Sequence, residues 1–308
     1  MMDALKYLIP ATLHAATPIL FAALGGLLTE LAGFINIGLE GILLTSAFFA
    51  VVVSTLAGNA WLGLAAGVAS GVLLSLLLAL VLLKLRANVV IAGFATNLLA
   101  AGGTVFLMAT WFGEEGVFRS PKTEVIPSMD LPLLDRVPLL GAALNHHNVL
   151  VYLGWIAVGA VAFLIYRTVW GLHLRVTGES PETAISTGVD VEGIRLQAFL
   201  LSGFLAGLGG SYLSLGLTQF FVRGMSGGRG FIALAAVYFG GFNPIGATLA
   251  SLLFGFAGGL ANYLQTLGLP SQLLEMTPYV LTIGALLIYS IRESPKYRKT
   301  EKETTKSL

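Results

Sequence analysis

Long apolar runs divided by short polar breaks constrain the fold of this chain more than any other feature. Runs long enough to cross a bilayer, which takes about 20 residues in a helix, follow one another through most of the 308 residues. Lipid offers no hydrogen-bond partners to a backbone, so each run must form a helix and not an open strand. The sequence therefore predicts an all-α integral membrane protein in which residues 1–308 form a single transmembrane domain.

Nine of these runs are candidate transmembrane spans. They lie near residues 11–29, 38–57, 60–84, 88–112, 148–169, 194–217, 229–242, 246–267 and 276–292. The seventh is short and includes a Gly-Gly-Phe-Asn-Pro break at 240–244, where proline cannot continue a helix. Such a span is typical of a partial or re-entrant helix. We therefore expect a polytopic bundle of about 8–9 transmembrane helices.

The composition supports lipid as the solvent and excludes several classes of function. Hydrophobic residues make up 56% of the chain and charged residues only 11%, which is more apolar material than one soluble core could bury. The net charge is +1, and no basic patch suggests nucleic acid as a partner. Cysteine is absent, which excludes disulfides, thiolate metal sites and cysteine nucleophiles.

Sequence motifs for catalysis and cofactor binding are missing as well. The glycine-rich segment 227–230 lacks the lysine and the hydroxyl of a phosphate-binding loop. The four histidines are spread over three regions, and no Gly-x-Ser-x-Gly nucleophile turn occurs. We therefore expect a protein that is not an enzyme and that carries no cofactor or metal of its own.

The distribution of lysine and arginine predicts the orientation in the membrane. The predicted spans alternate consistently if Lys84 and Arg86, the arginines of 167–195 and the tail from Arg292 onward are cytoplasmic, which places eleven of the seventeen basic residues on that side. The N-terminus is then outside and the C-terminus cytoplasmic. Segment 113–147 becomes an extracellular loop, either a connector or a docking surface for a partner, and 294–308 becomes a cytoplasmic tail.

A polar interruption at Gly171–Arg195 separates two apolar runs on the predicted cytoplasmic side. Within it, Ser180 can cap a short helix that has Pro181 at its first position and Glu182 in its first turn, and a glycine, Gly188, can end that helix. The segment 171–193 could be a simple surface connector, or it could present this helix to another protein.

Polar groups at membrane depth are costly unless they face a cavity or a partner. Asn36, Asn97 and Gln219 are therefore candidates for a polar path, with Asn97 the first choice because it lies in the middle of its span. Glu30 and Glu40 lie near predicted cytoplasmic helix ends, where snorkelling or helix capping would explain them. Glycines recur along the spans at 194–217 and 246–267 and predict close helix packing.

Several segments resemble one known family. Glu182-Thr183-Ala184-x-x-x-Gly188 resembles the Glu-Ala-Ala-x-x-x-Gly coupling loop of ATP-binding cassette (ABC) importer permeases, with Thr183 in place of the usual alanine. The blocks at 33–41, 97–100, 201–210 and 228–246 resemble the branched-chain amino acid/ribose ABC permease family across nearly the whole chain. The first and last blocks are most similar to its simple-sugar and nucleoside branch.

The resemblance implies one membrane subunit of an importer in a prokaryotic plasma membrane. Its partners would be separate ABC ATPase subunits, which bind ATP and magnesium, a second and different permease, and an extracellular solute-binding protein. The ATPase-coupling residues would be Ser180, Pro181, Glu182, Thr183, Ala184 and Gly188.

For the substrate, the resemblance favours a purine-type nucleoside, then a simple sugar, then a branched-chain amino acid. A nucleoside needs aromatic stacking and amide hydrogen bonds, which adds Tyr212 and Phe220 to the candidate path residues. The rival classes are an ion-coupled secondary transporter, which would need a carboxylate in mid-bilayer, and an integral membrane enzyme, which would need clustered catalytic groups.

Overall fold

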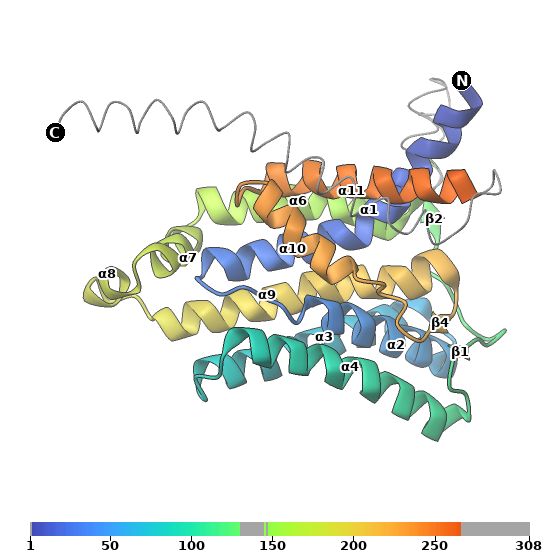
Figure 1. The fold of residues 1–308 in the computed structure, drawn as a ribbon, viewed down its shortest axis with the longest axis horizontal. Helices are drawn as coiled ribbons and strands as arrows, with labels where there is room; N and C mark the ends of the chain where they lie inside the picture. The colour runs from blue at the N-terminus through green and yellow to red at the C-terminus, as the bar shows by residue number, and fades with distance from the viewer. Residues whose placement is uncertain (1, 130–144, 146, 266–308) are drawn as a thin grey trace.

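The computed structural model is a bundle of long apolar helices (Figure 1). It describes residues 2–129, 145 and 147–265. Seven helical segments in these ranges are long and apolar enough to cross a membrane. They comprise α1 (Met2–Leu31), α2 (Leu39–Ala57), α3 (Ala60–Leu83), α4 (Val89–Phe112), α6 (Val149–Arg167), α9 (Val191–Ser211) with its π-helical continuation η2 (Tyr212–Thr218), and α11 (Pro244–Gln265).

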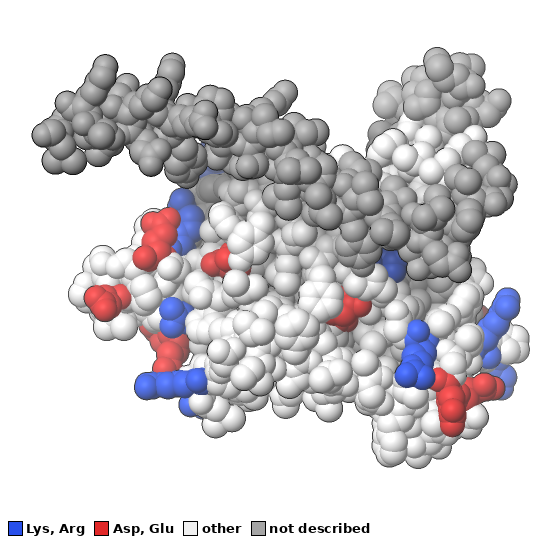
Figure 2. Space-filling model, in the orientation of Figure 1, with Lys and Arg blue, Asp and Glu red and all other residues white. Residues whose placement is uncertain are grey.

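These seven segments correspond to seven of the nine predicted spans, and they confirm the helical bundle. The predicted span at 229–242 is the shorter α10 (Arg229–Phe239), which has eleven residues. The predicted span at 276–292 and the predicted tail at 294–308 lie outside the described residues. On the face drawn in Figure 2, charged side chains gather toward the two ends of the bundle, and mostly uncharged atoms lie between them, as a bilayer requires.

Local capping sets the helix boundaries. The side chain of Asn59 accepts hydrogen bonds from the backbone N–H groups of Trp61 and Leu62 at the start of α3, and Asn88 caps α4 in the same way. Because an N-cap side chain satisfies N–H groups that have no partner within the helix, an asparagine directly before an apolar run fixes where the helix begins. Gly113 ends α4 with a φ of 71°, a left-handed conformation that glycine adopts without strain.

Small residues hold the bundle together along two seams. α3 packs along α9 and α1 packs along α11. A Cβ on Gly71 of α3 would overlap the Gly203 carbonyl of α9, and one on Gly255 of α11 would overlap Ala16 of α1. Since helices in lipid associate mainly by van der Waals packing, these glycines permit the close approach that the sequence predicted.

Two helices begin inside the bundle and run toward opposite ends. α2 follows the non-helical segment 32–38. Near the end of α2, the Ser54 hydroxyl donates a hydrogen bond to the Glu124 carbonyl, in the segment that follows α4. α10 follows the loop 219–228 and ends near Glu30 of α1, to which Tyr238 donates a hydrogen bond of 3.0 Å. Broken spans whose N-termini meet within the membrane are a recurring way to build a transport path.

The two ends of the bundle differ, and we name them by what they carry. The α8 end carries α7 (Val169–Glu179) and α8 (Pro181–Ser186), and the strand end carries four two-residue strands. β1 (Val117–Phe118) pairs antiparallel with β4 (Phe221–Val222), and β2 (Ser128–Met129) pairs antiparallel with β3 (His147–Asn148). These strands could not be predicted from the sequence, because two residues are too few to show an alternating pattern.

Candidate functional site

The polar interruption folds into two short helices that extend beyond the α8 end of the bundle (Figure 1). Thr168 caps α7 by accepting from the Gly171 N–H, which separates α7 from α6. In α8, Pro181 occupies the first helical position, as predicted. Gly188 follows with a φ of 83°, and its N–H donates to the Ile185 carbonyl at 3.0 Å. The short helix predicted between 178 and 188 is therefore α8.

One capping detail differs from the prediction. Ser180 stands at the N-cap of α8, but its hydroxyl bonds to the Thr183 hydroxyl at 2.7 Å and caps no backbone N–H. Ala184 is fully buried, whereas Glu182 and Thr183 are exposed and Ile185 is 63% exposed. The helix is thus fixed on one side and presents an acidic, a hydroxyl and an apolar side chain on the other.

Backbone contacts attach this segment to the junction between α1 and α2. A Cβ on Gly178 of α7 would overlap the Leu31 carbonyl at the end of α1. α9 follows α8 along the chain, and its residue Arg195 donates through Nε to the Ala32 carbonyl at 3.3 Å. The Arg195 guanidinium lies 4.9 Å from the centre of the Phe34 ring. The backbone of α7 at Gly178 therefore lies directly against the end of α1, with no flexible side chain between them.

Asn36 and Asn97, both predicted path residues, lie together where this junction enters the bundle. Asn36 is buried and donates to the Ser202 hydroxyl of α9 at 3.0 Å, while its Oδ1 has no partner among the described residues. Asn97 of α4 donates to the Ile37 carbonyl at 2.9 Å and accepts from the Gly41 N–H at 2.8 Å. Both amides hold the non-helical segment and the first turn of α2 in place.

Glu40 connects the two helices that begin inside the bundle. Its two carboxylate oxygens accept from the N–H groups of Gly228 and Gly230, each at 2.7 Å, at the N-terminus of α10. A helix N-terminus favours negative charge and has N–H groups without partners in the helix. Of the two roles expected for Glu40, snorkelling or helix capping, the structure shows capping, and the capped helix is α10. The sequence placed Glu40 near the cytoplasmic surface, whereas its carboxylate bonds to a helix that begins inside the bundle. We call residues 32–41 with the first turn of α10 the inner junction.

The three other predicted path residues lie toward the strand end. The Tyr212 ring is fully buried and its hydroxyl bonds to Nδ1 of His14 at 2.7 Å. Gln219 is exposed with a φ of 64°, and Arg119 lies 5.8 Å from the Phe220 ring centre. Tyr212 is ten residues from the Ser202 that contacts Asn36, about 15 Å along a helix. The five predicted residues thus form two separate groups.

Sequence reasoning missed three residues that complete these groups. His14 and Ser202 are single polar residues in apolar helices, and no spacing or motif marks them. Arg229 follows the α10 cap, where its guanidinium donates to the carbonyls of Met225 and Ser226 at 3.1 Å. Arg229 lies in the block at 228–246 that resembles the permease family, and this resemblance was the one sequence signal for it. Among the described residues, no group of three or more His, Cys, Asp or Glu side chains could hold a metal ion.

Comparison with known proteins identifies relatives over almost the whole chain. Residues 8–289 match the family described as branched-chain amino acid transport system/permease component. The guanosine ABC transporter permease NupQ of Bacillus subtilis is 36% identical, over 92% of this chain and 91% of that protein. The putative glucose ABC transporter permease TsgC13 of Haloferax volcanii is 35% identical, over 92% of both chains.

A third relative, the nucleoside ABC transporter permease NupC of Lactococcus lactis, is 35% identical over 94% of this chain and 93% of that protein. No solved structure matches the chain.

Proposed function

The chain belongs to the permease family of branched-chain amino acid transport systems, and on that premise we propose that it is a membrane subunit of an ABC importer of purine nucleosides. Two of the three relatives described above are named as guanosine or nucleoside permeases and the third as a glucose permease, which makes a simple sugar the second candidate. The single observation that carries the coupling part of the proposal is α8, an exposed helix tied rigidly to the bundle.

We assign α8 as the element that docks on a separate ABC ATPase subunit, where ATP and magnesium bind. The exposed Glu182, Thr183 and Ile185 form the contact surface, and buried Ala184 anchors it. The α8 end then faces the cytoplasm, the side to which the sequence analysis assigns Lys84, Arg86 and the arginines of 167–195. The N-terminus and the strand end face outward, toward a solute-binding protein.

The contacts of the inner junction give this docking site a route to the substrate path. Movement of α8 and α7 acts on Leu31–Phe34, and the following residues carry Asn36 and Glu40. Glu40 in turn holds the start of α10. A shift of this connected set would expose the path to one side of the membrane and then to the other.

The half-buried side chains of Glu40 and Asn97 indicate where that path lies. A carboxylate or an amide facing lipid at this depth would cost several kcal/mol, yet both side chains retain some exposure in the isolated chain. We propose that this exposed side faces the path that the chain forms with a second, different permease. Tyr212 and Phe220 would act nearer the outer mouth.

Uptake by the reconstituted importer tests the substrate. Proteoliposomes that contain this chain, its partner permease, the ATPase and the binding protein should take up labelled guanosine faster than labelled ribose, and ribose faster than leucine. An ATPase variant that binds but does not hydrolyse ATP is the control and should abolish all uptake. Leucine as the preferred substrate would overturn the nucleoside assignment, and uptake driven by an ion gradient without the ATPase would overturn the importer itself.

A further inference from the structure

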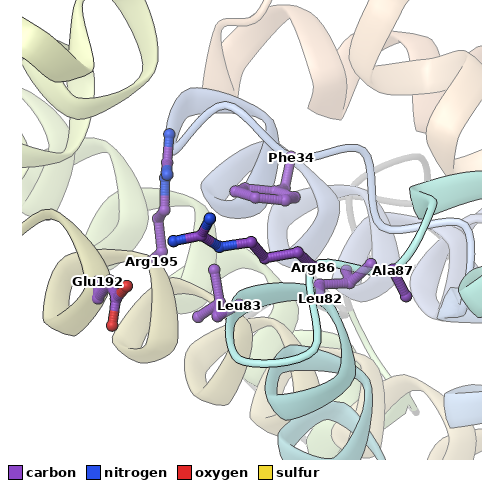
Figure 3. Close-up of a pocket in the computed structure, with 7 residues that line it drawn as sticks. All are labelled: Phe34, Leu82, Leu83, Arg86, Ala87, Glu192 and Arg195. Carbon is purple, nitrogen blue, oxygen red and sulfur yellow. The ribbon is translucent and has the colours of Figure 1, made fainter.

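A cavity of about 360 Å³ opens at the α8 end of the bundle, beside the inner junction (Figure 3). The end of α3, the turn that follows it, the start of α9 and the α1–α2 junction form its walls. The lining residues are Phe34, Leu82, Leu83, Arg86, Ala87, Glu192 and Arg195. Nothing in the proposed coupling or transport role requires a cavity here.

The charges of the cavity are unbalanced. Arg86 and Arg195 come from different elements and both line it, and Figure 3 shows the Arg86 side chain reaching toward Arg195. The one acidic lining residue, Glu192, lies on the far side of Arg195 from Arg86 in this view. Within the described residues neither guanidinium forms an ion pair within 4 Å, and the single carboxylate of Glu192, which interacts electrostatically with Arg195, cannot balance both arginines. Two like charges directed into one cavity repel each other unless an anion lies between them.

The Arg195 guanidinium and the backbone of Arg86 are held before any ligand arrives. Arg195 is fixed by its hydrogen bond to the Ala32 carbonyl and by the Phe34 ring. Arg86 has a φ of 51°, a left-handed conformation that is uncommon for a residue other than glycine. The turn around Arg86 is closed by the Ala87 N–H, which donates to the Val81 carbonyl at 3.3 Å. Backbone strain of this kind is found where the position of a side chain matters for function.

The chemistry of the cavity favours a phosphate group. A guanidinium offers a planar pair of N–H donors that matches phosphate oxygens, and two of them can share one phosphate. The Phe34, Leu82 and Leu83 side chains supply an apolar wall. Next to the cavity, Leu85 is 74% exposed and Ile91 is 71% exposed on the outer surface of the bundle, where lipid chains would lie.

We propose that this cavity binds a phosphate group, carried either by an anionic lipid headgroup at the bilayer surface or by a soluble phosphate ester. Basic pockets between transmembrane helices are known to hold lipid headgroups of this kind. A bound phosphate would bridge the α3–α4 turn to α9 and restrain Phe34. The site includes Phe34 and Arg195 of the proposed coupling route but none of the candidate path residues, so the proposal does not depend on the transported solute.

Ligand-dependent thermal stability of the purified full-length chain tests the proposal. The chain is titrated with phosphatidylglycerol or phosphatidylcholine in mixed micelles, and separately with inorganic phosphate against chloride of equal ionic strength. A ligand that binds the folded state raises the melting temperature with its concentration, which yields an apparent affinity. Arg86→Gln removes one guanidinium that makes no other described contact. Lys84→Gln removes the same charge two residues away, outside the cavity.

We expect phosphatidylglycerol to bind more tightly than phosphatidylcholine, with Arg86→Gln weakening the apparent affinity about tenfold and Lys84→Gln leaving it unchanged. Stabilisation by inorganic phosphate with the same dependence on Arg86 would assign the site to a soluble phosphate ester. Equal effects of Arg86→Gln and Lys84→Gln would show only general charge attraction and would overturn the proposal. It would also be overturned if neither the anionic lipid nor inorganic phosphate stabilised the wild-type chain more than its control.

Discussion

The carboxylate of Glu40 should contribute more to the stability of this bundle than any exposed acidic residue. It accepts two backbone hydrogen bonds of 2.7 Å from the start of α10. A hydrogen bond to a charged group contributes about 1.5–3 kcal/mol, and a buried N–H left without a partner costs about 1–3 kcal/mol. Glu40→Gln keeps one acceptor but turns an NH2 group toward the second N–H, so we expect a loss of about 2–4 kcal/mol.

Two measurements check this value. Reversible unfolding in mixed micelles gives the change in free energy, and hydrogen exchange of residues 228–231 reports on the start of α10 directly. A local loss of about 2–4 kcal/mol should speed that exchange by a factor of about 30 or more, because each 1.4 kcal/mol corresponds to tenfold. Glu182→Gln, which alters an exposed carboxylate, should change the stability by less than about 0.5 kcal/mol. Unchanged stability and exchange in Glu40→Gln would refute the assigned role of the carboxylate.

Three further substitutions test other contacts. Gly178→Val places side-chain atoms against the Leu31 carbonyl, so uptake by the assembled importer should fall, while Gly159→Val, in open space on α6, should retain more activity. Asn97→Leu removes both hydrogen bonds that join α4 to the inner junction and should lower the free energy of unfolding by about 2–4 kcal/mol. His14→Phe removes one partner of the buried Tyr212 hydroxyl, which keeps an interaction with Thr17, and should cost about 0.5–1.5 kcal/mol. Adding Tyr212→Phe should then cost less than the sum of the two single losses, and strictly additive losses would contradict the pairing.

The sequence predicts the local part of this fold closely. The runs predicted at 60–84 and 88–112 differ from α3 and α4 by one residue at an end, because apolar length and asparagine caps are properties of neighbouring residues. α7 was not predicted as a separate helix, because its eleven residues mix apolar and polar side chains and follow α6 with no loop between them. The cap that divides them, Thr168, becomes visible only once the helix ends are known.

The sequence predicts which residue types form the candidate sites, but not which of these residues lie together in the fold. Helix α8 could be predicted because Pro181 and Gly188 determine backbone geometry within a few residues. The bond between Glu40 and α10 joins residues about 190 positions apart, and hydrophobic periodicity contains no information on such a pairing. For the same reason, the sequence assigned Asn97, by its depth in a span, and Tyr212, by its aromatic ring, to one path, although tertiary packing separates them.

The central claim is that α8 transmits ATP hydrolysis to transport, and one paired measurement tests it most directly. ATP hydrolysis and guanosine uptake are recorded in the same proteoliposomes for Glu182→Lys and Gly188→Asp, with Lys84→Glu as a charge reversal at the same end of the bundle but outside α8. We predict that both α8 variants insert normally and hydrolyse ATP while uptake is lost, and that Lys84→Glu transports at the wild-type ratio of solute to ATP. Normal coupled transport in both α8 variants would contradict the account.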